Sequence, residues 1–305
     1  FEAAIGAVFE ALRGGQNALG GTYLSTLEAQ SDYTYGRGSY AVLNTYTGLD
    51  GTNTTRIGQI WDSFYLCIRN ANIVIQNAPN AKKLTPAEVA KFVSEAKFLR
   101  AITYFQLVRN WAGVPIRTEN NMTEIEIKRS TVEEVYKLIL EDLTFAEPNL
   151  PDVAPLPGKI TKWAVKTALA DVYFQLNRNA EARDKANEVI QSGNYSLVPV
   201  VVADDFNKLF GPDVITTPEE IFYLKYSALS SFWFGWFAHH PGSKLFGGGG
   251  FYALYTDKIT NQVIKNMDQN DLRYGLWYSY NIGLGPNSLL NKKFISPNTT
   301  EPTND

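Results

Sequence analysis

The chain has 305 residues, of which 45% are apolar and 19% charged, a balance typical of globular proteins. Its formal net charge is −3 and it holds no run of Lys or Arg, which argues against a nucleic-acid partner. The single cysteine, Cys67, excludes a disulfide framework and a cysteine metal site within the chain. No stretch approaches the roughly 20 apolar residues that a membrane span needs.

The N-terminal part changes from helical to loop-like composition and back. Apolar residues recur at helical spacing over Ile5–Leu12. Residues 20–55 are rich in Gly, Ser, Thr and Tyr and have no sustained period, which predicts long loops with one short helix at most. A helix follows over residues 60–78 and ends before Pro79. One face of this helix is formed by Trp61, Phe64, Tyr65, Ile68, Asn72 and Ile75.

Two further helices carry strong start signals. Thr85 followed by Glu88 is a capping-box pattern, and the helix that it opens is expected to end at Gly113. The same capping pattern recurs at Ser130 or Thr131, at the start of a helix that ends near residue 148.

The next two helices, over residues 161–177 and 179–192, are expected to form a hairpin. A motif in this hairpin repeats one in the helix that Thr85 opens: Arg100-Ala101-x-x-Tyr104-Phe105-x-Leu107 aligns with Leu169-Ala170-x-x-Tyr173-Phe174-x-Leu176. The separation is close to twice the tetratricopeptide period of ~34 residues. In this interpretation the small Ala lets a partner helix approach and the Tyr-Phe pair fills the next groove. A chance match is the alternative.

The pattern changes after Tyr195. Residues 204–211 indicate a loop or a short helix, and alternation over Glu219–Ser227 predicts a strand. A short helix is expected near Thr260–Met267, and the rest of the chain is typical of loops with short strands.

Five blocks of sequence resemble, in the right order, the SusD/RagB family of surface nutrient-binding lipoproteins of Gram-negative bacteria. The block at residues 94–116 keeps Glu95, Ala96, Phe98, Leu99, Arg100, Ala101, Tyr104, Phe105, Gly113, Val114, Pro115 and Ile116. The other blocks are residues 60–75, 129–151, 158–198 and 219–227. The resemblance extends over about Phe1 to Arg273.

The resemblance implies a mostly α fold of tetratricopeptide-like helical hairpins with a loop-rich, partly β ligand-binding region. We expect one domain over residues 1–305, with the scaffold at about 56–195 and the binding region at about 20–55 and 200–305. Family members are usually longer and return to a C-terminal helix with an Arg-Tyr-Ala-(Asp/Glu)-(Val/Leu) motif, which this sequence lacks. We therefore expect the C-terminal part of the family fold to be missing, and a lipid-anchored cysteine to have been trimmed from the N-terminus.

The first candidate binding segment is aromatic. Five of the seven residues over 232–238 are aromatic, and glycines fill positions 247–250. Flat rings stack on the apolar face of a pyranose at little cost in rotamer entropy, and glycines allow close approach. We expect ligand binding by Trp233, Phe234, Trp236 and Tyr252, because the resemblance implies aromatic platforms in loops beside the helical scaffold. The alternative is that half of these rings are core.

The second candidate segment is residues 31–48, and the resemblance places its Ser-Asp region near the ligand site. The carboxylate of Asp32 and the guanidinium of Arg37 suit sugar hydroxyls, and Tyr33, Tyr35 or Tyr40 could stack on the sugar. The alternative is turn chemistry, with Asp32 in an Asx-turn and Arg37 paired on the surface.

The remaining polar candidates favour structural roles. His239 and His240 are neighbours without an evident third ligand, so we expect no metal and no cofactor. Arg100 is expected to pair with Glu95 or a carbonyl, and Asn72 to be a satisfied interior amide. Cys67 is expected to be a small buried hydrophobe. The sequence holds no Gly-x-Ser-x-Gly, P-loop or His-Glu-x-x-His motif, and its paired acids are adjacent rather than set across a cleft, so we expect no enzyme.

The resemblance therefore implies a non-catalytic protein at the cell surface. It would be lipid-anchored in the outer membrane, bind a glycan or oligosaccharide and pass it to a TonB-dependent transporter. An oligopeptide-binding RagB-like protein, a tetratricopeptide scaffold for a protein partner and a glycoside hydrolase remain as alternatives.

Overall fold

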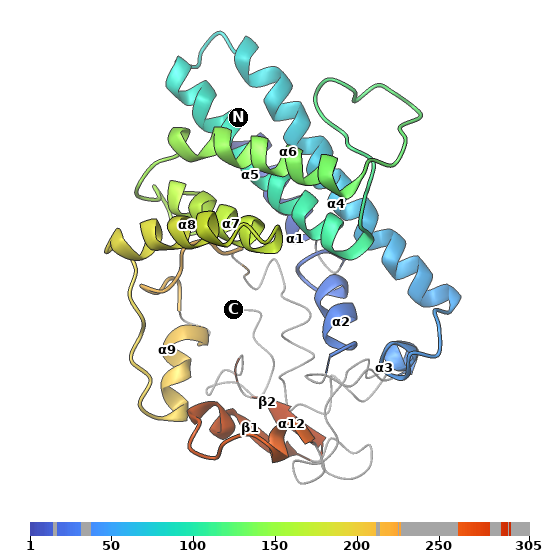
Figure 1. Ribbon diagram of the computed structural model, residues 1–305, viewed down its shortest axis with the longest axis vertical. Helices are drawn as coiled ribbons and strands as arrows, with labels where there is room; N and C mark the ends of the chain where they lie inside the picture. The colour runs from blue at the N-terminus through green and yellow to red at the C-terminus, as the bar shows by residue number, and fades with distance from the viewer. Residues whose placement is uncertain are drawn as a thin grey trace. The chain divides into compact units, whose positions relative to one another are not determined.

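The computed structural model describes residues 1–14, 17–31, 38–211, 214–224, 226, 262–280, 288–291 and 293 (Figure 1). These residues are mostly helical, which confirms the predicted fold class. They divide into two compact units. The helical unit comprises Phe1–Arg13, Trp61–Ser196 and Pro218–Lys225, and the loop-rich unit comprises Gly14–Ile60, Leu197–Thr217 and Tyr226–Asp305.

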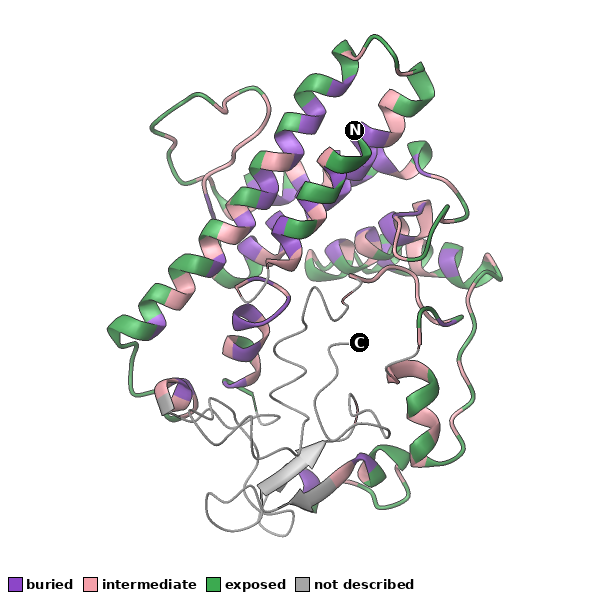
Figure 2. Cartoon of the chain, turned by 180° about the vertical axis from the view of Figure 1, so that it is seen from behind, coloured by how far each residue is buried: buried purple, intermediate pink, exposed green. Residues whose placement is uncertain are grey.

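The helical unit is built from paired helices. Its elements are α1 (Glu2–Arg13), most of α4 (Gly51–Asn77), η2 (Ala78–Asn80), α5 (Pro86–Trp111), α6 (Val132–Ala146), η3 (Glu147–Asn149), α7 (Lys162–Gln175) and α8 (Asn179–Gln191). Helix α6 lies along α5, and α7 and α8 form the predicted hairpin (Figure 1). Figure 2 shows that the long helices carry buried positions on one side and exposed positions on the other.

Local signals set the helix boundaries. Thr85 caps α5: its hydroxyl accepts from the Glu88 amide at 3.3 Å, and the Glu88 carboxylate accepts from the Thr85 amide at 2.8 Å. Thr131 and Glu134 repeat this arrangement at 3.2 and 2.8 Å, so Thr131, and not Ser130, caps α6. Both predicted capping boxes are confirmed, because the sequence neighbours that make them are only three residues apart.

Helix α4 begins nine residues earlier than predicted, at Gly51 instead of Ile60. Its first turns carry small polar residues without an apolar period, so the pattern gave no helix signal. In the structure, polar contacts stabilise the first turn of α4. The Asp50 carboxylate accepts from the Asn53 amide at 2.8 Å, and the Asn53 side chain is 2% exposed.

The loop-rich unit consists of short elements. They are α2 (Thr22–Glu28), η1 (Gly38–Tyr40), α3 (Ala41–Thr45), η4 (Ala203–Phe206), α9 (Asn207–Phe210), α12 (Gln262–Lys265), η5 (Leu272–Leu276), β1 (Trp277–Tyr280) and β2 (Ser288–Asn291). β1 and β2 pair antiparallel, from Trp277 opposite Asn291 to Tyr280 opposite Ser288. The predicted short helix near residue 264 and the predicted short strands are confirmed. The prediction of one helix at most in residues 20–55 is wrong, because α2 and α3 are too short to show a period.

Two predictions about packing are also wrong. Residues 219–224 and 226, the described part of the predicted strand, form turns, bends and irregular chain without a ladder, since alternation in sequence provides no partner strand. Instead the Phe222 ring lies 5.1 Å from the Phe98 ring and 6.2 Å from the Phe9 ring. Phe174, expected to fill a groove as Phe105 does, is 68% exposed, because the described helices leave this end of α7 uncovered.

Candidate functional site

Most of the predicted binding residues lie outside the described part of the chain. They are Asp32, Tyr33, Tyr35, Arg37, Trp233, Phe234, Trp236 and Tyr252. Their roles stay predictions, as does the loop role of His239 and His240, which also lie outside it. The structure does describe Tyr40 and the chain on both sides of residues 32–37, and these define the framework of the candidate site.

The chain after residue 37 is fixed by two side chains from the start of α4. The Asn53 amide donates to the Ser39 carbonyl at 2.6 Å, and the Arg56 guanidinium donates to the Ser39 hydroxyl at 2.7 Å. The Arg56 guanidinium also lies 3.8 Å from the centroid of the Tyr40 ring, which is 1% exposed. Tyr40 therefore anchors η1 in this structure, and a stacking role for it stays a prediction that requires Arg56 to move away.

The chain before residue 32 is fixed from α3 in the same way. The Asn44 amide donates to the Ala29 carbonyl at 2.6 Å. The Tyr46 hydroxyl donates to the Gln30 carbonyl at 2.7 Å. The described chain on either side of residues 32–37 is thus held by hydrogen bonds from residues 44–56. Sequence reasoning missed these partners, although Asn and Arg in a polar helix start are a signal for backbone capture.

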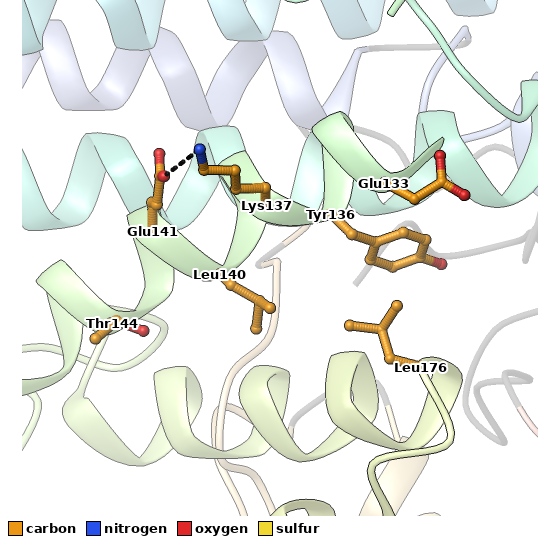
Figure 3. A pocket seen from close by; sticks show the side chains of 7 residues that line it. All are labelled: Glu133, Tyr136, Lys137, Leu140, Glu141, Thr144 and Leu176. Carbon is orange, nitrogen blue, oxygen red and sulfur yellow. Dashed lines mark ion pairs between the residues drawn. The ribbon is translucent and has the colours of Figure 1, made fainter. Parts of the chain in front are cut away.

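A shallow groove of about 640 Å³ lies on the helical unit between α6 and the end of α7 (Figure 3). Tyr136 and Leu140 of α6 face Leu176 across it, and Glu133, Lys137, Glu141 and Thr144 complete the lining. Tyr136 is 8% exposed, and burial raises the pKa of its phenol, which therefore stays protonated. An apolar floor with a charged rim suits an apolar side chain of a ligand or partner.

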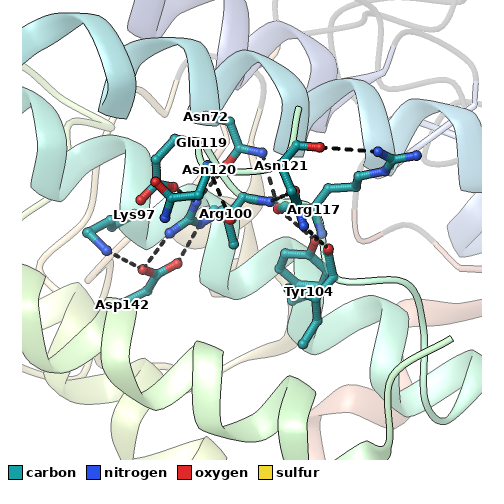
Figure 4. Close-up of polar contacts among 11 residues, drawn as sticks. Asn72, Lys97, Arg100, Tyr104, Arg117, Glu119, Asn120, Asn121 and Asp142 are labelled. Carbon is teal, nitrogen blue, oxygen red and sulfur yellow. Dashed lines mark hydrogen bonds and ion pairs between the residues drawn. The ribbon is translucent and has the colours of Figure 1, made fainter. Parts of the chain in front are cut away.

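A buried polar network lies between α4, α5 and α6 (Figure 4). Arg100 is 1% exposed and donates to both oxygens of Asp142 at 2.7 and 2.8 Å, to the Asn72 side chain at 2.6 Å and to the Glu119 carboxylate at 2.6 Å. Burial disfavours the guanidinium cation, but the hydrogen bonds and charges of the two carboxylates outweigh it, so the pKa of Arg100 is raised. Lys97 also binds Asp142, at 2.6 Å.

The predicted pairing of Arg100 with Glu95 is wrong. Glu95 lies 3.9 Å from Lys91, one turn earlier on the same helix. The true partner, Asp142, comes from a different helix, and no local spacing in sequence identifies it.

The network anchors the loop that follows α5. The Tyr104 hydroxyl accepts from the Arg117 amide at 2.7 Å and donates to the Arg117 carbonyl at 3.0 Å, and the Asn72 amide donates to the same carbonyl at 3.1 Å. Asn72 is therefore the satisfied interior amide that the sequence predicted. With these side chains committed to one another, the network is a structural element and offers no group to a ligand.

The lone cysteine is buried in the helical unit. Cys67 is fully buried, and its sulfur lies 3.2 Å from the Thr103 hydroxyl oxygen. Burial raises the pKa of the thiol to about 12, which keeps it un-ionised. This confirms the predicted small buried hydrophobe. Among the residues that the structure describes, no three His, Cys, Asp or Glu side chains gather as a metal site, and no helix could span a membrane.

Comparison with known proteins identifies the family. A family model described as "Starch-binding associating with outer membrane" matches residues 16–174, more than half of the chain. The chain belongs to the SusD-like family. The matched range contains α2 to α6, most of α7 and the whole framework around residues 32–37.

Curated relatives support the assignment of this SusD-like chain. A SusD-like protein of Formosa agariphila is 33% identical over 163 residues, which make up 52% of this chain and 31% of the relative. A SusD-like protein of Bacteroides ovatus is 30% identical over 171 residues, 54% of this chain and 30% of the relative. The matched part of the chain thus spans less than a third of the length of these two relatives.

Solved structures share the fold. A SusD superfamily protein from Bacteroides vulgatus superposes with a TM-score of 0.78 and 19% identity, covering 98% of this SusD-like chain and 68% of that protein. At identities this low the similarity establishes the fold alone.

Proposed function

We propose that this SusD-like chain belongs to a non-catalytic protein that captures a glycan or oligosaccharide at the cell surface. The observation that carries the proposal is the match of residues 16–174 to a starch-binding, outer-membrane family. A structural relative with 24% identity and a TM-score of 0.62, which covers 79% of this chain and 51% of that protein, is named as a laminarin-binding SusD-like protein. Both descriptions name binding and no reaction.

The proposed contacts follow from sugar chemistry. Asp32 and Arg37 bind hydroxyls with planar hydrogen-bonding groups, while Trp233 and Trp236 stack on the pyranose rings. The framework supports this assignment, because Asn44 and Asn53 fix the chain on either side of residues 32–37. A ligand loop with fixed ends loses less conformational entropy when it binds.

The remaining parts of the proposal concern delivery. The protein is lipid-anchored in the outer membrane and passes its glycan to a TonB-dependent transporter. The family description, which names association with the outer membrane, supports the location.

A second candidate function, docking of a protein partner on the helical unit, is favoured by the groove between α6 and α7. Its floor is formed by Tyr136, Leu140 and Leu176, and Phe174 nearby in sequence is 68% exposed. An apolar floor of this kind suits a protein side chain better than a sugar hydroxyl.

Native-gel retardation in polysaccharide-containing gels separates the two functions. The wild-type protein and the variants Trp233→Ala and Trp236→Ala are run with starch, laminarin and no glycan. We expect glycan-dependent retardation that is reduced in both variants. The matched control is Phe174→Ala, an exposed aromatic residue of the helical unit, which should behave as wild type. If neither starch nor laminarin retards the wild-type protein, and the protein binds the purified transporter in a way that depends on Phe174, the second function would replace the first.

A further inference from the structure

One aromatic side chain of the second candidate segment that the sequence analysis did not select is exposed to solvent. Tyr46, directly after α3, is 72% exposed. It is the most exposed aromatic residue among those whose burial the structure describes. Tyr40, six residues earlier in a stretch of similar composition, is 1% exposed. The fold thus buries one of these rings and leaves the other open.

The exposed ring is held in place. The Tyr46 hydroxyl donates to the Gln30 carbonyl at 2.7 Å, so the side chain is fixed at both its backbone and its tip. An unattached surface tyrosine would sample several rotamers and lose that freedom on stacking. A tethered ring loses little, which is the property that favours tyrosine at binding surfaces.

The backbone of Tyr46 is also unusual. Its φ is 52° and its ψ 33°, the left-handed region at the end of α3. Gly or Asn adopts this conformation more readily than a bulky residue. A bulky residue is thus kept in a backbone conformation that disfavours it, and its aromatic ring is left in solvent. Both features point to a role in binding rather than in folding.

The position of Tyr46 associates it with the candidate site. Its hydrogen-bond acceptor, Gln30, lies two residues before Asp32. The Asn44 side chain, two residues before Tyr46, binds the Ala29 carbonyl at 2.6 Å. Asn44 and Tyr46 therefore both hold the backbone of residues 29–30. Thr45 and Thr47, on either side of the ring in sequence, are exposed hydroxyl residues that can accept and donate hydrogen bonds.

We propose that Tyr46 is a sugar-stacking residue: its exposed, tethered ring binds the apolar face of one pyranose unit of an oligosaccharide. The inference rests on the proposed function, since it extends the same glycan surface to a residue that sequence reasoning did not select. The hydroxyl orients the ring through Gln30, and the ring face makes the contact.

The test measures affinity and stability together in three variants. Calorimetric titration with starch-derived and laminarin-derived oligosaccharides is paired with thermal unfolding of the same samples. We expect Tyr46→Ala to weaken glycan binding on the order of tenfold, as loss of one stacked ring does. Tyr46→Phe keeps the ring but loses the hydrogen bond to Gln30, so its affinity should fall between that of the wild type and that of Tyr46→Ala.

Tyr46→Asn distinguishes binding from folding. Asn tolerates the left-handed backbone, so this variant should unfold at the wild-type temperature or above it while its glycan affinity falls as in Tyr46→Ala. Wild-type affinity in both Tyr46→Ala and Tyr46→Asn would overturn the inference. If the wild type binds and Asp32→Ala weakens binding while the Tyr46 variants do not, only this inference fails. If the wild type binds no glycan, the proposed function fails with it.

Discussion

Replacing Arg100 by Met should destabilise the helical unit more than any surface change of the same kind. The substitution roughly keeps the volume and removes the guanidinium that binds Asp142, Asn72 and Glu119. Asp142 is 0% exposed and would remain in the interior with Lys97 as its cationic partner.

The expected loss of stability depends on the partners that Asp142 and Glu119 keep once Arg100 is removed. Breaking a buried ion pair by removing one partner costs about 3–5 kcal/mol. Lys97 still binds Asp142 at 2.6 Å and Glu119 is partly exposed to water, so the lower end applies, about 3 kcal/mol. At about 2–4 °C per kcal/mol for a unit of this size, the melting temperature should fall by roughly 6–12 °C.

The assay is urea unfolding of wild type, Arg100→Met and a matched control, followed by helix content. The control is Arg109→Met on the same helix, where the exposed guanidinium contacts the Phe105 ring at 4.3 Å, and the expected loss is under about 1 kcal/mol. Adding Asp142→Leu to Arg100→Met should recover part of the loss, because the fully buried carboxylate is then removed, while the Lys97 side chain that it leaves is 18% exposed. A loss below about 1 kcal/mol for Arg100→Met would refute the reasoning.

Three further changes test other parts of the structure. Thr85→Ala should cost about 1 kcal/mol in urea unfolding through loss of the α5 cap, while a loss within error would contradict the capping box. Cys67 should react with a maleimide only on unfolding, and rapid labelling of native protein would show that the thiol is accessible. Burial raises the pKa of Glu95, so the folded state binds more protons than the unfolded state between pH 4.5 and that pKa. Glu95→Gln should therefore be more stable than wild type at pH 7, where the buried carboxylate is charged, and this difference should shrink toward pH 5. A difference that stays constant with pH would contradict the raised pKa of Glu95.

Local chemistry made much of the scaffold predictable. The capping boxes at Thr85 and Thr131 bring donors and acceptors only three residues apart, so sequence spacing is enough to identify them. The start of α4 was missed for the opposite reason. Its polar first turns are stabilised by contacts such as that between Asn53 and the Ser39 carbonyl, which leave no period in the sequence.

Partners far apart in sequence could not be predicted. Arg100 pairs with Asp142 of another helix, whereas the sequence suggested Glu95 on the same helix or a carbonyl. The tyrosines make the same point for the candidate site. Tyr40 and Tyr46 share a Gly/Ser/Thr-rich context, yet Arg56 covers Tyr40 at 3.8 Å while Tyr46 stays open. Composition indicates that rings are available, and only packing decides which of them faces solvent.

The central claim is that this SusD-like chain binds carbohydrate, and isothermal titration of the purified protein with a panel of starch, laminarin and short peptides tests it most directly. We predict saturable binding of at least one glycan, lost when Trp233 and Trp236 are both replaced by Ala. Saturable binding of a peptide, with no heat from any glycan, would contradict the claim.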